Sequence, residues 1–226
     1  ADIQAGKRIA VHDGKIVEAR VFFHHNPGHS GGPPGSGGGG KDTSTCFALI
    51  SKGAKWKTTE SYVVDATNND GLSNNFVKNG ISTDMTTWDS QVAFDIFGNE
   101  NLGAVVDGPD SVSPDNKNEI MFGSISSQGT IAATIVWGIF SGPPSGREIV
   151  EYDMVFDDPD YLWGDATLNS SFMDFENVVT HELGHALGLN HPSLICTEET
   201  MYAFADDGET KKRTLSAGDI AGVNSL

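Results

Sequence analysis

Residues 181–191 constrain this chain more than any other stretch, because one motif specifies a helix, its end and the return of the chain. They read H-E-L-G-H-A-L-G-L-N-H, which has the form H-E-x-x-H-x-x-G-x-x-H. His181 and His185 are four residues apart, so on a helix they share one face. Gly188 follows where a helix commonly ends with a positive φ. A turn at this glycine can bring His191 back beside the other two histidines.

Three neutral imidazoles in this arrangement have the chemistry of a catalytic zinc site. Zinc takes histidine nitrogens in tetrahedral geometry, and three protein ligands leave the fourth position open for water. Glu182 lies on a neighbouring face of the helix, from which it can reach a zinc-bound water without binding metal itself. An isolated H-x-x-x-H pair is often a chance feature of a surface helix. Five specified positions in one stretch, with an apolar side that includes Phe175, Val178 and Leu187, favour the metal site.

The stretch resembles the zinc signature of the metzincin metallopeptidases, and among these the chain most resembles the matrixins. Met201 follows the third histidine where these enzymes have a methionine turn. Residues 155–158 and Trp163 resemble the strand and loop before their active-site helix, and residues 215–223 resemble their closing helix. The resemblance extends from about residue 55 to the C-terminus. It departs from the family at Pro192, where many matrixins carry a small polar residue.

The resemblance implies an α+β fold of the metzincin (zincin-like) kind. We expect a twisted, mostly parallel sheet of about five strands with two long helices. A zinc cleft should lie below an edge strand, and a small C-terminal subdomain should end in a final helix. Residues 130–140 correspond to that edge strand, whose unpaired amides would bind an extended peptide by strand addition.

The implied function is that of a zinc-dependent endopeptidase that hydrolyses extended protein substrates. Glu182 would activate the zinc-bound water, and His181, His185 and His191 would hold one zinc. Met201 would support the metal site as an apolar side chain.

Further roles follow from the same resemblance. Residues 203–214 would wall the pocket for the side chain after the cleaved bond, with residues 211–213 at its solvated outer edge. Asp157 and Asp160 stand where matrixins place calcium-binding acids, so they are candidate calcium ligands. Residues 113–118 have the composition of a calcium loop but not the EF-hand ligand order, and a solvated loop is the default interpretation.

The remaining elements are predicted from local patterns. Residues 9–11 and 16–23 predict two strands joined by an Asp13-Gly14 turn. Further strands are predicted at residues 61–65, 119–123 and 149–156. A helix is predicted at residues 76–94, where the apolar positions have helical spacing. Ser216 is a good N-cap for the last helix.

The N-terminal part differs in composition from the rest of the chain. We expect residues 1–30 to be an N-terminal segment, a candidate remnant of a pro-segment, and residues 41–226 to be the catalytic domain. Residues 31–40 contain only Gly, Pro and Ser, which predicts a flexible linker. All seven histidines lie in the first 30 residues or in the motif, so a second zinc site in the main domain lacks ligands. The four N-terminal histidines could bind metal, but we interpret them as part of a polar, solvated tail.

The chain has two cysteines, Cys46 and Cys196. Two cysteines in a secreted protein usually pair, so we predict a disulfide. The alternative is that the Cys46 thiol takes the fourth zinc position, but its surroundings do not resemble the matrixin switch motif.

Charge and hydropathy exclude some partners. The net charge of −17 argues against nucleic acid and anionic membranes, and no run of eighteen apolar residues could span a bilayer. We therefore expect a secreted monomer whose partners are proteins or peptides. Two alternatives stay open: a latent zymogen held inactive by its N-terminal segment, and a zinc-stabilised binding domain without activity.

Overall fold

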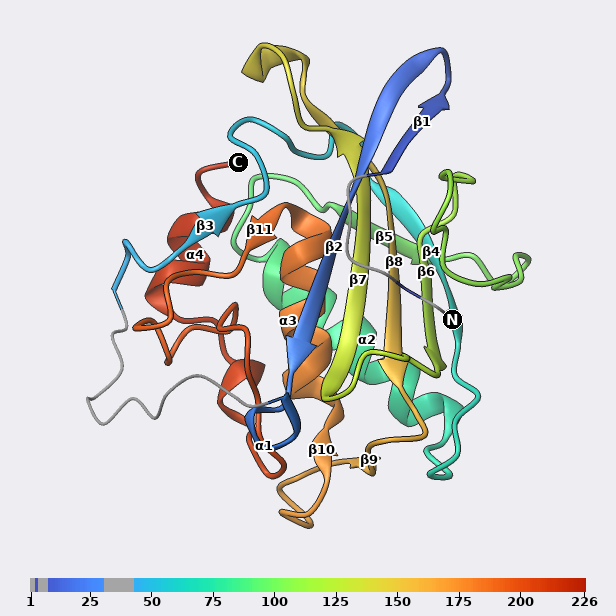
Figure 1. The fold of residues 1–226 in the computed structure, drawn as a ribbon, viewed down its shortest axis with the longest axis vertical. Helices are drawn as coiled ribbons and strands as arrows, with labels where there is room; N and C mark the ends of the chain where they lie inside the picture. The colour runs from blue at the N-terminus through green and yellow to red at the C-terminus, as the bar shows by residue number, and fades with distance from the viewer. Residues whose placement is uncertain (1–2, 4–7, 31–42) are drawn as a thin grey trace.

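The computed structural model describes residue 3, residues 8–30 and residues 43–226, and the predicted 31–40 linker lies outside these ranges. Figure 1 shows a twisted sheet with two long helices packed on one face. The strands are β1 (Arg8–His12), β2 (Lys15–His25), β3 (Ala48–Leu49), β4 (Glu60–Asp65), β5 (Phe97–Glu100), β6 (Glu119–Gly123), β7 (Thr130–Ile139), β8 (Glu148–Asp157), β9 (Trp163–Gly164), β10 (Met173–Asp174) and β11 (Leu189–Asn190). The helices are α1 (Pro27–Ser30), α2 (Asn74–Asp89), α3 (Phe175–Leu187) and α4 (Ala217–Val223), with short 3-10 turns at Pro144–Gly146 and Lys211–Arg213.

The main sheet has seven strands in the order β1-β2-β7-β8-β6-β4-β5. β5, β4, β6 and β8 pair in parallel, and β7, β2 and β1 continue the sheet with antiparallel pairs. The five strands from β4 to β8 correspond to the expected sheet. The N-terminal hairpin adds two more, so the expected number of about five strands is too low.

The long helices form where the sequence supplies both caps and an apolar face. Ser73 caps α2 by accepting a hydrogen bond from the Phe76 amide, and the buried positions of α2 include Ile81, Met85 and Trp88. This helix ends at Asp89, five residues before the predicted end at Phe94. The final helix α4 begins after Ser216, as predicted, in a capping box completed by Asp219.

The core lies on both faces of the sheet. One cluster fills the space between the sheet and helices α2 and α3, and includes Trp88, Phe156, Trp163 and Phe175. A second cluster covers the opposite face. β7 and β8 therefore carry apolar side chains on both faces, which explains why residues 130–140 read as an almost continuous apolar run.

The expectation that β7 is an edge strand with unpaired amides is wrong. β2 lies along it as an antiparallel neighbour, from Glu18 opposite Gly138 to His25 opposite Thr130. In Figure 1, β2 runs beside β7 in front of helix α3. The reason is that β2 carries alternating side chains that pack on both faces, so the N-terminal hairpin takes the free edge of β7.

No helix in the described ranges is long and apolar enough to cross a membrane.

Candidate zinc site

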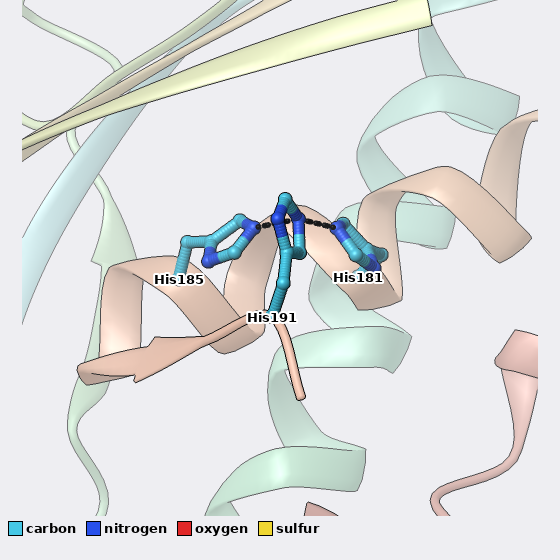
Figure 2. Close-up of side chains that lie close together, drawn as sticks. All are labelled: His181, His185 and His191. Carbon is cyan, nitrogen blue, oxygen red and sulfur yellow. Dashed lines mark hydrogen bonds between the residues drawn. The ribbon is translucent and has the colours of Figure 1, made fainter. Parts of the chain in front are cut away.

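Helix α3 and the turn after it bring the three motif histidines together. Asp174 caps the helix by accepting from the Asn177 amide, and Gly188 ends it with φ of 118°. β11 then pairs with β3, which fixes the direction in which the chain returns. Figure 2 shows the rings of His181 and His185 on the helix, with His191 reaching between them from the returning segment.

The histidine nitrogens meet at one point. The His191 Nε2 atom lies 3.1 Å from Nε2 of His181 and 3.0 Å from Nε2 of His185. The Nδ1 atom of His181 lies 2.6 Å from the Thr200 carbonyl oxygen, and that of His185 lies 2.9 Å from the Leu189 carbonyl oxygen. A carbonyl can only accept, so each Nδ1 carries the proton and each Nε2 presents a lone pair to the shared point.

This donor set fits a tetrahedral zinc ion. Zn–N bonds of 2.0–2.1 Å place ligand nitrogens about 3.3 Å apart, close to the separations between these Nε2 atoms. Burial lowers the pKa of His185 to about 3 and lowers the pKa values of His181 and His191 well below the ordinary range. The imidazoles are therefore neutral at pH 7, as metal ligation requires.

Glu182 lies next to the histidines and is fully buried. Its Oε2 accepts a hydrogen bond of 2.5 Å from the Thr134 hydroxyl, whereas Oε1 has no hydrogen-bond partner. Burial raises the pKa of Glu182 to about 8, and the hydrogen bond from Thr134 opposes this rise. One carboxylate oxygen is thus held by β7 while the other is free to exchange a proton.

Met201 lies beneath the motif helix and is almost fully buried. A Cβ atom added to Gly184 would lie 2.2 Å from the Met201 sulfur, so this glycine lets the methionine pack directly against the helix. Asp219 holds the turn, because its carboxylate accepts from the amides of Thr200 and Met201. The Thr200 carbonyl in turn orients His181.

Two residues of β2 cover the site. The Phe22 ring stacks on the His185 ring with centroids 4.2 Å apart, and the His24 ring stacks on the His181 ring at 3.8 Å. His24 Nδ1 lies 3.5 Å from Glu182 Oε1. His24 is fully buried, so the interpretation of the N-terminal histidines as a solvated tail is wrong for this residue.

Lys212 also departs from its predicted environment. It was expected on a solvated outer edge, yet it is fully buried, and its Nζ donates to the Phe204 carbonyl and pairs with Glu209. Local sequence could not reveal this, because a Lys-Lys-Arg run is typical of solvent-facing chain. Thr134 was missed as well. The signal for it was a polar residue at the centre of an otherwise apolar strand.

The remaining site predictions have different outcomes. Cys46 and Cys196 form a disulfide, as predicted. Asp157 is buried and accepts from the Ile125 amide, whereas Asp160 is exposed. Neither belongs to a group of three potential metal ligands in the described part of the chain, so their role as calcium ligands stays a prediction.

Comparison with known proteins supports the resemblance to the matrixins that was inferred from the zinc motif. A family model of the matrixins matches residues 138–226, the part that contains β8, α3, the zinc motif and α4. A matrilysin from Rattus norvegicus is 38% identical over 69 residues, which are 30% of this chain. The match spans 24% of the length of that relative.

Proposed function

We propose that this chain, whose residues 138–226 match the matrixin family model, is a member of that family and a zinc-dependent endopeptidase. We propose His181, His185 and His191 as the ligands of one zinc ion, and Glu182 as the general base. The observation that carries the proposal is the convergence of three histidine Nε2 atoms beside a buried carboxylate. A disulfide-bonded chain of this composition suits a secreted protein.

When bound, zinc supplies a Lewis acid that polarises the scissile carbonyl and makes water more acidic. Glu182 takes the proton of the attacking water on its free oxygen and then returns it to the leaving amine. Thr134 keeps the other oxygen in place, so the proton is exchanged at Oε1. Met201 and Asp219 fix the floor of the site and, through Thr200, the orientation of His181.

A second candidate is the latent form of the same enzyme. Helix residues His181, Glu182 and His185 are each 0% exposed, because β2 lies over them. A protein substrate cannot reach the zinc site while β2 stays in this position. The third alternative, a zinc-stabilised binding domain without activity, is disfavoured by the carboxylate of Glu182 beside the ligands.

The substitution Glu182→Ala tests the function. We expect one zinc per chain to remain, because the three ligands are intact, and turnover of a casein substrate to fall by at least about 100-fold, since a general base is lost. Zinc is measured by elemental analysis, and turnover is measured both before and after removal of the N-terminal segment. Glu198→Ala, a change at a half-exposed glutamate outside the site, is the matched control.

The result that would overturn the proposal is turnover by Glu182→Ala at the rate of the unchanged protein. A folded chain that binds no zinc would overturn the metal site itself.

A further inference from the structure

A cavity of about 200 Å³ opens beside the C-terminal end of α3. Its walls come from the segment before β4, the loop after α2, the last residue of α3 and the end of the chain around α4. The apolar lining includes Trp56, Val92, Ile96, Leu187, Val223 and Leu226. The three motif histidines and Glu182 do not line it, so this cavity is separate from the candidate zinc site.

The loop after α2 is shaped by the last residue of that helix. The Asp89 carboxylate accepts from the Ile96 amide at 3.0 Å and from the Phe97 amide at 3.2 Å. These two hydrogen bonds draw the chain back to the helix end, so that residues 92–94 stand out as one wall of the cavity.

The opposite walls are also fixed by contacts within the protein. The Lys55 carbonyl accepts from the Ile149 amide at 3.1 Å, and the indole nitrogen of Trp56 donates to a main-chain carbonyl of α3 at 2.8 Å. A Cβ atom added to Gly188 would lie 3.3 Å from Cδ2 of Leu226, so the end of the chain packs directly against the end of the helix. The cavity is therefore formed before any ligand binds, as most small-molecule sites are.

The polar groups of the cavity lie on one side chain that carries charge and one that does not. Lys55 is exposed and is the one charged side chain among the described residues that line the cavity. No described carboxylate forms an ion pair with it. The amide nitrogen of Asn224 already donates to the Ile220 carbonyl at 2.8 Å. A ligand that matches this lining has an apolar body for the cavity and an anionic group for Lys55.

The volume of the cavity limits the body of the ligand to about one ring. An apolar protein cavity of roughly 150 Å³ holds a benzene molecule. A cavity of about 200 Å³ therefore takes one aromatic ring with a short alkyl chain. The Phe94 side chain lines the same cavity and is 46% exposed, so a ring that enters gains an aromatic neighbour.

We propose that this cavity is a binding site for a small aromatic carboxylate. The ring lies between residues 92–94 and Leu187, and the carboxylate pairs with the ammonium group of Lys55 at the opening. The occupant is a free small molecule and not a segment of a protein. The site is independent of the proposed peptidase activity, because it uses neither the motif histidines nor Glu182.

The test is isothermal titration calorimetry of the full chain with 3-phenylpropanoate as the probe. We expect a dissociation constant of about 1 mM or tighter, as suits a ligand of this size. The neutral 3-phenylpropan-1-ol should bind about 3- to 10-fold more weakly, and the cationic 3-phenylpropylamine at least about 10-fold more weakly, because only the carboxylate is attracted by Lys55. Equal affinity for all three compounds would overturn the assignment of the anionic group.

Matched lysine variants test the role of Lys55. Lys55→Gln should weaken binding of 3-phenylpropanoate by about 3- to 10-fold and leave binding of the alcohol unchanged, because only the charge is removed. Lys52→Gln removes the charge of an exposed lysine outside the cavity and should change neither. The same loss in both variants would show a general effect of protein charge and would count against the site.

A second pair of variants tests where the ring binds. Ala93→Phe adds a ring at an exposed position of the cavity lining and should weaken all three compounds at least about 10-fold. Asn99→Phe adds the same ring at an exposed position of β5, outside the cavity, and should have no effect. Thermal unfolding of both variants checks that the fold is kept.

A carboxylate can also bind a metal ion, so the candidate zinc site is the competing location. His191→Ala should leave the affinity for 3-phenylpropanoate unchanged if the cavity is the site. Affinity that is lost in His191→Ala and kept in Ala93→Phe would overturn the proposal, as would the absence of measurable binding to the unchanged protein. Neither result would affect the proposed peptidase, which is tested separately with Glu182→Ala.

Discussion

At the scale of single residues, burial decides the protonation of carboxyl groups across this molecule. Glu151 on β8 is fully buried, and its candidate ligand oxygen lies within 4.8 Å of those of Asp110 and Asp153. Burial, then the charge of Asp153, raises the pKa of Glu151 from 4.5 to about 9. The Asn116 amide donates to its Oε2 and partly opposes the rise. Glu151 therefore holds a proton at neutral pH in the folded protein and loses it when the chain unfolds.

This proton gives a testable pH dependence of stability. Because the folded state binds the proton more tightly than the unfolded state, the free energy of unfolding falls as pH rises from 4.5 towards 9, by at most about 1.4 kcal/mol per pH unit. Glu151→Gln carries a neutral amide at every pH, so its stability should fall less over this range. Urea unfolding at pH 5, 7 and 9 measures the difference, with Glu198→Gln as the surface control. Parallel pH curves for Glu151→Gln and the unchanged protein would contradict this account.

At the scale of elements, the candidate zinc site depends on how the segments beside α3 are held. The indole nitrogens of Trp56 and Trp88 donate to the carbonyls of Ala186 and Thr180 on α3, which fixes the helix against its neighbours. The disulfide joins the segment before β3 to the loop that leads to Met201. β3 pairs with β11, so the same covalent link supports the strand that returns His191.

Removal of the disulfide should therefore lower the free energy of unfolding while the zinc content of the folded protein stays the same. Cys46→Ala with Cys196→Ala opens a cross-link between residues 150 positions apart, and in the chain-entropy model this lowers the free energy of unfolding by about 5 kcal/mol. Calorimetry should show a fall in Tm of roughly 10–20 °C. Zinc content at low temperature should stay at one per chain. A Tm unchanged by the double substitution would contradict the prediction, because it would show that the disulfide does not reduce the conformational entropy of the unfolded chain.

At the scale of the whole molecule, the candidate zinc site brings together parts of the chain that are distant in sequence. The site gathers α3, the returning segment with His191, the turn at Met201, and β2 from the N-terminus. A zinc ion that binds this arrangement and not the unfolded chain stabilises the entire fold by mass action.

Chelation of zinc should therefore lower the Tm of the unchanged protein, and readdition should restore it. At a free zinc concentration 100 times the dissociation constant, the stabilisation is about 2.7 kcal/mol, or roughly 5–10 °C in Tm. Glu182→Ala should respond as the unchanged protein does, whereas His191→Ala should lose the response. A zinc-dependent Tm in His191→Ala equal to that of the unchanged protein would contradict the proposed ligand set.

The sequence by itself determined the elements whose causes are local. The spacing of His181 and His185, the positive φ required at Gly188 and the Ser216 cap each depend on a few neighbouring residues, and each has its expected backbone in the structure. The Asp13-Gly14 turn likewise gave the N-terminal hairpin. The disulfide between Cys46 and Cys196 could be predicted from the number of cysteines alone, since two cysteines allow only one pairing.

Tertiary structure alone decided which segment covers the motif histidines. Nothing in the local pattern of residues 15–25 indicates which strand they join, because strand pairing depends on packing between segments more than 100 residues apart. For the same reason the burial of His24 and Lys212, and the hydrogen bond from Thr134 to Glu182, could not be read from the sequence. A histidine or a lysine is solvated or enclosed according to its neighbours in space, and those neighbours come from distant parts of the chain.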